Sequence, residues 1–253
     1  MSNKHQMVEN NYKQAARIIE AAETISQLPV RVSWDDTLQV GAKLHLSEIE
    51  WSKQLRISVN PKRQDIPYLV ASQCAVAIRF FQQKEAKQLV TVKGCQERTV
   101  NEYSELGYSP EEAEVITKKT HSGIGDQLRG MPSQIVVTTW LYRDYPELRE
   151  NQLLHCTREV ETSYASLTML PSKFPQWILT SHQAMNGAFA LATDYLLGRN
   201  DLFEPFKNKG FETICTGLLG DVIDSKPETP DTDLVTSWLK RLELTDRFEW
   251  TII

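Results

Sequence analysis

Cysteine is scarce in this sequence, and its four cysteines are scattered over 253 residues. Cys74, Cys95, Cys156 and Cys215 form no Cys-x-x-Cys pair, which argues against a zinc ribbon or a thioredoxin-like redox motif. Disulfide frameworks are typical of shorter secreted chains. The spacing therefore predicts free thiols in a reducing compartment, and we expect a cytoplasmic protein.

Basic charge is not in excess. The chain has 28 Lys and Arg against 33 Asp and Glu, which gives a net charge of −5. Proteins that bind nucleic acid usually gather Lys and Arg on one face, whereas the basic runs here are short and lie near carboxylates. We therefore expect no nucleic-acid partner.

Long apolar runs are missing as well. The N-terminus has no apolar segment of the signal-peptide kind. The uncharged stretch over residues 174–193 contains Gln, Ser, His and Asn side chains that are too polar for contact with lipid. The sequence predicts a helix buried inside protein there, and no membrane partner.

Motifs for metal binding and nucleophilic catalysis are also missing. No two of the five histidines form a local pair of zinc ligands. There is no Gly-x-Ser-x-Gly elbow, P-loop or Rossmann fingerprint. Cys74 lies among apolar residues, which is typical of a buried structural thiol. We expect no metal and no cofactor, although a zinc site assembled from distant histidines stays open.

The hydrophobic pattern indicates an α+β protein. Residues 9–28 have the spacing of an amphipathic helix. Residues 30–34, 38–46 and 55–59 alternate between apolar and polar, which predicts a small, mainly antiparallel sheet. From residue 66 onward the pattern is mainly helical. We expect a single domain, with the N-terminal helix and sheet over residues 1–60 and a helical majority over 61–253.

Several helix ends carry clear signals. Ser109-Pro110-Glu111-Glu112 predicts a capping box at the start of a helix, and residues 144–147 repeat that logic before a helix that runs to about residue 167. Pro175 should begin a helix and Gly198 should end it. Further helices are expected over 211–223 and 231–242. Residues 135–139 are β-branched and could form a strand, but we assign them to helix. Residues 94–108 and the segment DSKPETPD suggest linkers.

The stretch HSGIGDQLRG, from His121 to Gly130, is rich in glycine and polar residues. Its backbone N–H groups, with Asp126 and an arginine nearby, could cradle an anion. The alternative is a loop in which Gly123 and Gly125 adopt positive φ angles, with His121 at the end of the preceding helix. His121 and Asp126 are therefore candidate binding residues.

The segments LRISVNP and IPYLVASQCAVAIRFF form a strand followed by a helix, after an N-terminal helix and a short sheet. This order resembles the ImmA/IrrE-like metallopeptidases of the zincin type, and HQAMNGAFALATDYLLG resembles a later helix of that family. The resemblance places the family's His-Glu-x-x-His near residues 72–76, where Ser72, Gln73 and Val76 stand instead. It implies a pseudo-peptidase scaffold that keeps a cleft for strand addition.

We therefore expect a non-catalytic regulatory or protein-interaction protein, whose partner is another protein or a second copy of the chain. The aromatic and basic segment TTWLYRDYPELR suits an interface. The candidate binding residues are His121, Asp126, Trp140, Tyr142, Arg143 and His182. The alternative is a hydrolase whose site is assembled from distant residues, namely Cys74, His121, Asp126, His155 and His182.

Overall fold

The computed structural model describes residues 12–83 and 87–252. The chain divides into two compact units. Unit 1 comprises residues 1–84 and 137–156, and unit 2 comprises residues 85–136 and 157–253. The sequence suggested one domain, with a small sheet before residue 60 and mainly helices after it. In the structure, the chain passes from one unit to the other three times. Each unit is therefore described by itself.

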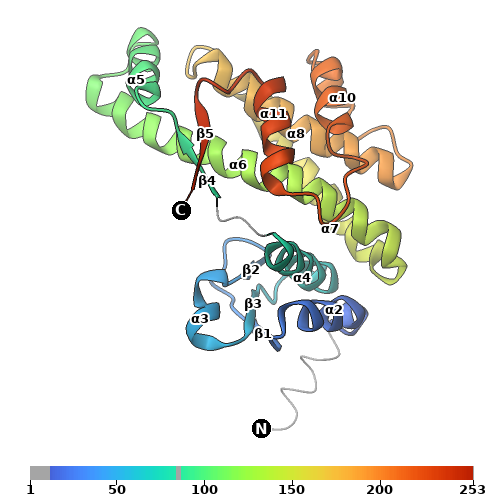
Figure 1. Ribbon diagram of the computed structural model, residues 1–253. Helices are drawn as coiled ribbons and strands as arrows, with labels where there is room; N and C mark the ends of the chain where they lie inside the picture. The colour runs from blue at the N-terminus through green and yellow to red at the C-terminus, as the bar shows by residue number, and fades with distance from the viewer. Residues whose placement is uncertain (1–11, 84–86, 253) are drawn as a thin grey trace. The chain divides into compact units, whose positions relative to one another are not determined.

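Unit 1 packs helices on one face of a three-stranded sheet (Figure 1). Its elements are η1 (Lys13–Ala15), α2 (Ala16–Ser26), β1 (Val30–Trp34), β2 (Ala42–Leu44), η2 (Leu46–Glu48), α3 (Ile49–Ser52), β3 (Leu55–Val59) and α4 (Ile66–Gln82), followed later in the chain by η3 (Pro146–Leu148). The strand order is β1-β3-β2, with β1 parallel and β2 antiparallel to β3. Residues 9–11 of the expected first helix lie outside the described residues.

One expected strand is shorter than the sequence suggested. We expected residues 38–46 to be extended, but only Ala42–Leu44 form β2. The reason is a turn that starts at Asp35, whose carboxylate accepts hydrogen bonds from the backbone N–H and the hydroxyl of Thr37. Such side-chain bonds to neighbouring backbone compete with strand pairing.

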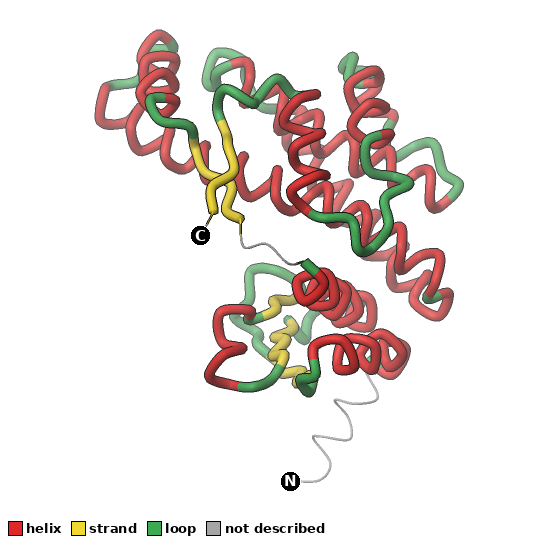
Figure 2. The backbone as a smooth tube through the Cα atoms, viewed as in Figure 1, coloured by secondary structure: helices red, strands yellow, loops and turns green. Residues whose placement is uncertain are grey.

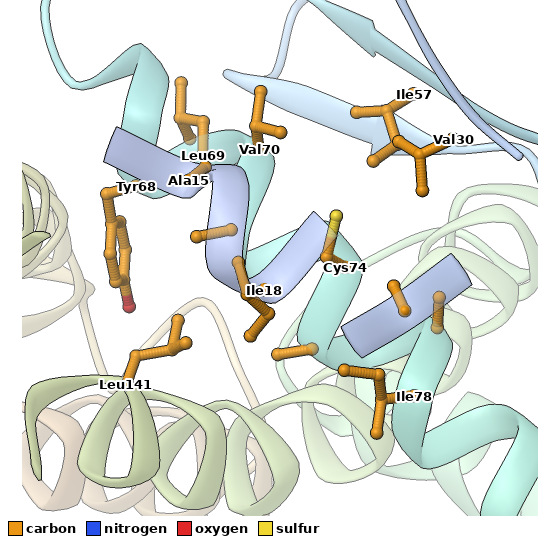
Figure 3. Packing of buried hydrophobic residues seen from close by; sticks show 14 of the residues in the cluster. Ala15, Ile18, Val30, Ile57, Tyr68, Leu69, Val70, Cys74, Ile78 and Leu141 are labelled. Carbon is orange, nitrogen blue, oxygen red and sulfur yellow. The ribbon is translucent and has the colours of Figure 1, made fainter. Parts of the chain in front are cut away.

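The core of unit 1 lies between the sheet and helices α2 and α4 (Figure 3). Ile18 of α2, Ile57 of β3 and Cys74 of α4 are fully buried there. Burial of one such aliphatic side chain contributes about 1.5–3 kcal/mol. The sequence correctly predicted that Cys74 is a buried thiol, and burial raises its pKa well above the usual range.

Unit 2 is mainly helical and contains a two-stranded ribbon (Figure 2). Its elements are β4 (Lys87–Thr91), α5 (Cys95–Glu105), η4 (Tyr164–Thr168), α8 (Gln176–Leu197), α9 (Glu204–Lys207), α10 (Glu212–Gly220), α11 (Asp231–Arg241) and β5 (Phe248–Ile252). Helices α6 (Pro110–Asp144) and α7 (Arg149–Ser163) contribute to both units. Small sheets beside a helical majority confirm the α+β class, and the described residues contain no helix long and apolar enough to cross a membrane.

Two helix boundaries follow from the predicted caps. The backbone N–H of Ser109 donates to Glu112 Oε2 at 3.0 Å, and the Glu112 N–H donates to Ser109 Oγ at 3.3 Å. This reciprocal capping box begins α6. Gly198 ends α8 with φ of 63°, a conformation that glycine adopts without steric cost.

Two expectations from the sequence were wrong. HSGIGDQLRG is not a turn, because residues 121–130 lie inside α6 and neither Gly123 nor Gly125 has a positive φ. Residues 94–108 are not a linker, because most of them form α5. The buried side chains Cys95, Thr99 and Tyr103 recur every four residues on one face of that helix, so tertiary packing stabilises it despite its polar composition.

Candidate functional site

A cavity of about 380 Å³ lies in unit 2 between β4 and one face of α6. This volume is within the range of small-ligand pockets. We call it the β4–α6 cavity. Its lining residues are Gln88, Leu89, Val90, Thr91, Gln96, Lys118, His121, Ser122, Gly125, Arg129 and Phe248.

The residues from α6 share one helix face because they recur at intervals of three and four. His121, Gly125 and Arg129 are spaced by four, and Lys118 lies three residues before His121. Gly125 contributes only backbone, and a Cβ atom built on it would lie 3.5 Å from Phe248 of β5. A larger side chain at position 125 would therefore occupy the cavity.

The other wall of the cavity is β4, which pairs only with β5 among the described strands. Val92 N–H donates to Arg247 O at 2.9 Å, so this pair is hydrogen-bonded. Hydrogen-bonded and non-bonded pairs alternate along an antiparallel ladder. Thr91 with Phe248 and Leu89 with Trp250 are therefore non-bonded pairs. The backbone N–H and C=O groups of Leu89 and Thr91 point away from β5. Within residues 12–83 and 87–252 these groups have no backbone partner.

His121 is 3% exposed and lines this cavity. Its Nε2 lies 2.9 Å from Thr99 Oγ1, and the Thr99 hydroxyl donates its proton to Cys95 O at 3.1 Å. Thr99 must then accept from His121, so Nε2 carries the ring proton and Nδ1 carries the lone pair. This Nδ1 is buried and has no hydrogen-bond partner in the described part of the chain.

The charge state of His121 follows from its surroundings. Burial and, to a lesser extent, the positive charge of Arg247 lower its pKa to about 4, against the opposing effect of Glu102. Arg247 is held in place because its guanidinium donates to Glu102 at 2.9 Å and lies 4.2 Å from the ring centroid of Trp177. His121 is therefore a neutral hydrogen-bond acceptor at pH 7.

Lys118 and Arg129 give the cavity a positive character, because no carboxylate lines it. Arg129 forms an exposed ion pair with Asp126, three residues earlier on α6. Exposed pairs of this kind contribute about 0–1 kcal/mol, so Arg129 can exchange Asp126 for an anionic ligand at low cost. The cavity can thus offer two cations and the outward-facing backbone groups of Leu89 and Thr91.

Of the sequence-derived candidates in unit 2, His121 lines this cavity, whereas Asp126 and His182 do not. Asp126 is exposed beside the cavity and pairs with Arg129. His182 on α8 bonds Gln127 Oε1 through Nδ1 at 2.8 Å, and burial lowers its pKa. Gln127 in turn donates to Asn186 Oδ1 at 3.2 Å. His182 is therefore part of a separate polar network between α6 and α8.

Trp140, Tyr142 and Arg143 belong to unit 1. Trp140 packs against the hydrophobic core, with its ring at 6.0 Å from that of Tyr145. Tyr142 is half-buried beneath the guanidinium of Arg149, which lies 4.7 Å from its ring centroid. Arg143 is exposed. Trp140 and Tyr142 therefore contribute to packing around the end of α6.

The residues proposed for a dispersed hydrolase site have other partners. In unit 1, Cys74 is buried in the core and His155 Nδ1 lies 2.7 Å from the buried carboxylate of Asp65. The ring of Tyr68 covers His155 at 4.9 Å. The described residues contain no group of three His, Cys, Asp or Glu side chains arranged to hold a metal ion.

The positions that the zincin resemblance marks as catalytic are structural here. Ser72 donates to Leu69 O at 2.9 Å within α4. Gln73 Oε1 accepts the Leu44 N–H at 3.0 Å and so occupies a donor on the outer edge of β2. Strand addition at that edge would have to displace Gln73.

A second constellation in unit 1 has the composition of a catalytic triad. His45 Nε2 lies 2.9 Å from Ser58 Oγ, and His45 Nδ1 lies 3.3 Å from Glu48 Oε1. However, Arg56 Nη2 lies 3.4 Å from the same Nδ1 and donates to Glu48 at 3.0 Å. Arg56, whose guanidinium can only donate, therefore competes with His45 for the Glu48 carboxylate and crowds the same Nδ1. In a catalytic triad the carboxylate serves to orient the histidine, so this arrangement departs from a triad.

The sequence carried only part of the signal for the β4–α6 cavity. The spacing of His121, Gly125 and Arg129 was visible, but three glycines suggested a turn instead of a helix face. The opposite wall depends on pairing of residues near position 90 with residues near position 250. Comparison of the chain with protein-family models, curated proteins and solved structures finds no match.

Proposed function

We propose that this chain is a non-catalytic protein-interaction protein that binds an extended, acidic segment of a partner protein in the β4–α6 cavity. The observation that carries this proposal is the edge of β4 at Leu89 and Thr91, whose backbone groups face away from β5 beside a cavity lined by two cations and no carboxylate. A strand that adds to a sheet edge gains main-chain hydrogen bonds, while its side chains supply specificity.

The edge of β4 suits this role better than the outer edge of β2. The backbone groups of Leu89 and Thr91 face away from β5, whereas the Leu44 N–H of β2 is already bonded to Gln73. A segment paired with β4 would also lie beside Lys118 and Arg129. Acidic side chains in that segment would complement both cations, and such complementarity favours one class of partner over others.

A fluorescein-labelled heptapeptide, Glu-Val-Glu-Val-Glu-Val-Glu, is a suitable probe because alternating valines favour an extended chain. We expect its fluorescence anisotropy to rise with the full-length protein at about 50 mM salt and to rise less at higher salt. The peptide with Lys in place of Glu should not bind. Equal binding of both peptides, or binding of neither, would refute the proposal.

Variants of α6 locate the binding site. Lys118→Glu combined with Arg129→Glu should weaken binding of the acidic peptide by at least about tenfold, whereas Lys119→Glu changes an exposed neighbour that does not line the cavity. Gly125→Met should block the cavity, and Gly123→Met is its control because Gly123 has open space around it. Circular dichroism checks that each variant is folded.

A further inference from the structure

The sheet of unit 1 has a polar face on the side away from the hydrophobic core. Successive side chains of a strand point to opposite faces of a sheet, and Leu55, Ile57 and Val59 of β3 point into the core. The alternate positions of the three strands therefore share the other face. We call it the outer sheet face, and its side chains are Arg31 and Ser33 of β1, Lys43 of β2, and Arg56 and Ser58 of β3.

Two arginines lie side by side on the outer sheet face. Arg31 is in register with Arg56, and neighbouring strands are about 4.8 Å apart. Like charges at directly opposite positions of a sheet destabilise the fold. Arg31 is exposed and forms no hydrogen bond or ion pair within residues 12–83 and 87–252. An anion bound between the two side chains would remove this repulsion.

Arg56 keeps donors for such an anion. Its Nη2 donates to Glu48 Oε1 at 3.0 Å, but its side chain is still 38% exposed, and a guanidinium has several further N–H groups. Asp35 follows β1, where its carboxylate is already bonded to Thr37. Lys43 is exposed and has no partner in the described chain. The cations of this face therefore outnumber the carboxylates of Glu48 and Asp35.

A chain of hydroxyl groups ends beside the two arginines. Ser33 is exposed and lies two positions after Arg31 on the same strand. Its Oγ lies 3.3 Å from Ser58 Oγ, which lies 2.9 Å from His45 Nε2. When Ser33 donates its proton to an external oxygen, Ser58 can donate to Ser33 and His45 to Ser58. Each hydroxyl in the chain then both donates and accepts a hydrogen bond, which strengthens the donor at Ser33.

A phosphate monoester matches this set of donors. It is mostly dianionic at pH 7 and has three oxygens that accept hydrogen bonds. The guanidinium groups of Arg31 and Arg56 and the hydroxyl of Ser33 supply one donor group for each oxygen. Arginine clusters bind phosphorylated residues in several peptide-recognition domains, because the planar guanidinium can bond two phosphate oxygens at once.

The setting of these residues favours a phosphate carried by a protein. Small-molecule sites are usually concave, whereas Arg31, Ser33 and Lys43 are all exposed. Proteins that bind single-stranded nucleic acid stack its bases on aromatic side chains, and none of the five positions of the outer sheet face is aromatic. The net charge of −5 also opposes the approach of a polyanion.

We propose that the outer sheet face binds a phosphorylated side chain of a partner protein, with the phosphate on Arg31, Arg56 and Ser33. Lys43 lies across β3 from Ser33 and would attract an acidic residue of the same segment. This site lies in unit 1, and it uses no residue of the β4–α6 cavity. Either proposal can therefore fail while the other stands.

The peptide Glu-Gly-phosphoserine-Gly-Glu, blocked at both ends, is the probe. It carries a carboxylate on each side of the phosphate, so that one can reach Lys43 in either direction of the chain. In an NMR titration of the ¹⁵N-labelled full-length protein, the amide signals of Arg31, Ser33, Arg56 and Ser58 should shift and saturate. The unphosphorylated peptide should leave these signals unchanged. Inorganic phosphate should bind about fivefold more weakly, because it cannot use Lys43.

Variants separate a ligand contact from a structural role. Arg31→Gln should weaken binding of the phosphopeptide by at least about tenfold. It should not lower the melting temperature, because it removes one of two like charges at opposite positions. Ser33→Ala should weaken binding about fivefold, the effect of one hydrogen bond. Lys62→Gln removes an exposed cation outside the face and should bind like the wild type.

Several results would overturn the proposal. One is equal binding of the phosphopeptide to Arg31→Gln and the wild type, and another is a set of shifts confined to unit 2. If inorganic phosphate binds as tightly as the phosphopeptide, the face recognises a free anion and not a partner protein. If the oligonucleotide (dT)₈ shifts the same signals and binds more tightly, the partner is a nucleic acid.

Discussion

The carboxylate of Asp65 lies 2.7 Å from His155 Nδ1 and ties the start of α4 to α7 within unit 1. Arg63 Nη2 lies 2.7 Å from the same oxygen. Burial raises the pKa of Asp65, but the hydrogen bonds from His155 and Arg63 outweigh burial and hold this pKa well below its usual value. The ionised carboxylate is therefore the form that stabilises the fold.

This cluster predicts a loss of stability in acid. A carboxyl group with a lowered folded pKa stabilises the protein above its unfolded pKa of about 4, and this contribution is lost as the pH falls toward the folded pKa. Asp65→Asn should lower the free energy of unfolding at pH 7 by about 3–5 kcal/mol and flatten its decline below pH 4. Urea unfolding between pH 7 and 3 measures both effects.

Asp36→Asn is the matched control, because it removes the same charge from an exposed position in unit 1. It should leave the stability at pH 7 within about 0.5 kcal/mol of the wild type. Equal losses in the two variants would contradict the assigned role of Asp65.

Two substitutions of Gln73 by side chains of similar size should differ in their effect on stability. Gln73→Glu keeps an oxygen that can accept the Leu44 N–H, whereas Gln73→Leu leaves this donor without its partner. The leucine variant should lose about 1–3 kcal/mol of unfolding free energy, and the glutamate variant should lose less. Size-exclusion chromatography should also show more self-association for Gln73→Leu, since an unblocked strand edge promotes pairing between chains.

Replacing two glycines inside α6 by alanine should stabilise the protein. Gly123 and Gly130 lie inside the helix with open space around them, so each change to alanine should add about 0.5–1 kcal/mol. Gly198→Ala should instead destabilise it by about 1–2 kcal/mol, because φ is +63° there. Thermal unfolding of the three variants checks the opposite signs. A loss of stability in Gly123→Ala would contradict the helical assignment of HSGIGDQLRG.

Local chemistry explains why parts of the fold were predictable. Ser109 and Glu112 mark the start of α6 by bonding to each other. Pro175 marks the start of α8 and Gly198 marks its end, each through the conformation of its own backbone. The alternation over residues 30–34 and 55–59 likewise reflects one buried sheet face. None of these features depends on distant parts of the chain, so each can be recognised from a short window of sequence.

The parts that sequence reasoning missed depend on distant contacts. Helix α5 is polar, and its Thr99 is buried because His121 and Arg247 contact it. The β4–α6 cavity requires β4 to pair with the C-terminal strand β5. His121 was among the candidates from the sequence, but it was chosen for its place in a turn that does not exist. The tautomer of His121 depends on its contact with Thr99, which lies 22 residues earlier and so cannot be inferred from a short window of sequence.

Amide hydrogen exchange along β4 tests the central claim most directly. In the free protein we expect fast exchange at Leu89 and Thr91, whose N–H groups face away from β5, and slow exchange at Val90, which pairs with Glu249. Saturation with Glu-Val-Glu-Val-Glu-Val-Glu should protect Leu89 and Thr91 and leave Val90 unchanged. Protection at Leu89 and Thr91 that is already high without peptide, or that does not rise with it, would contradict strand addition at β4.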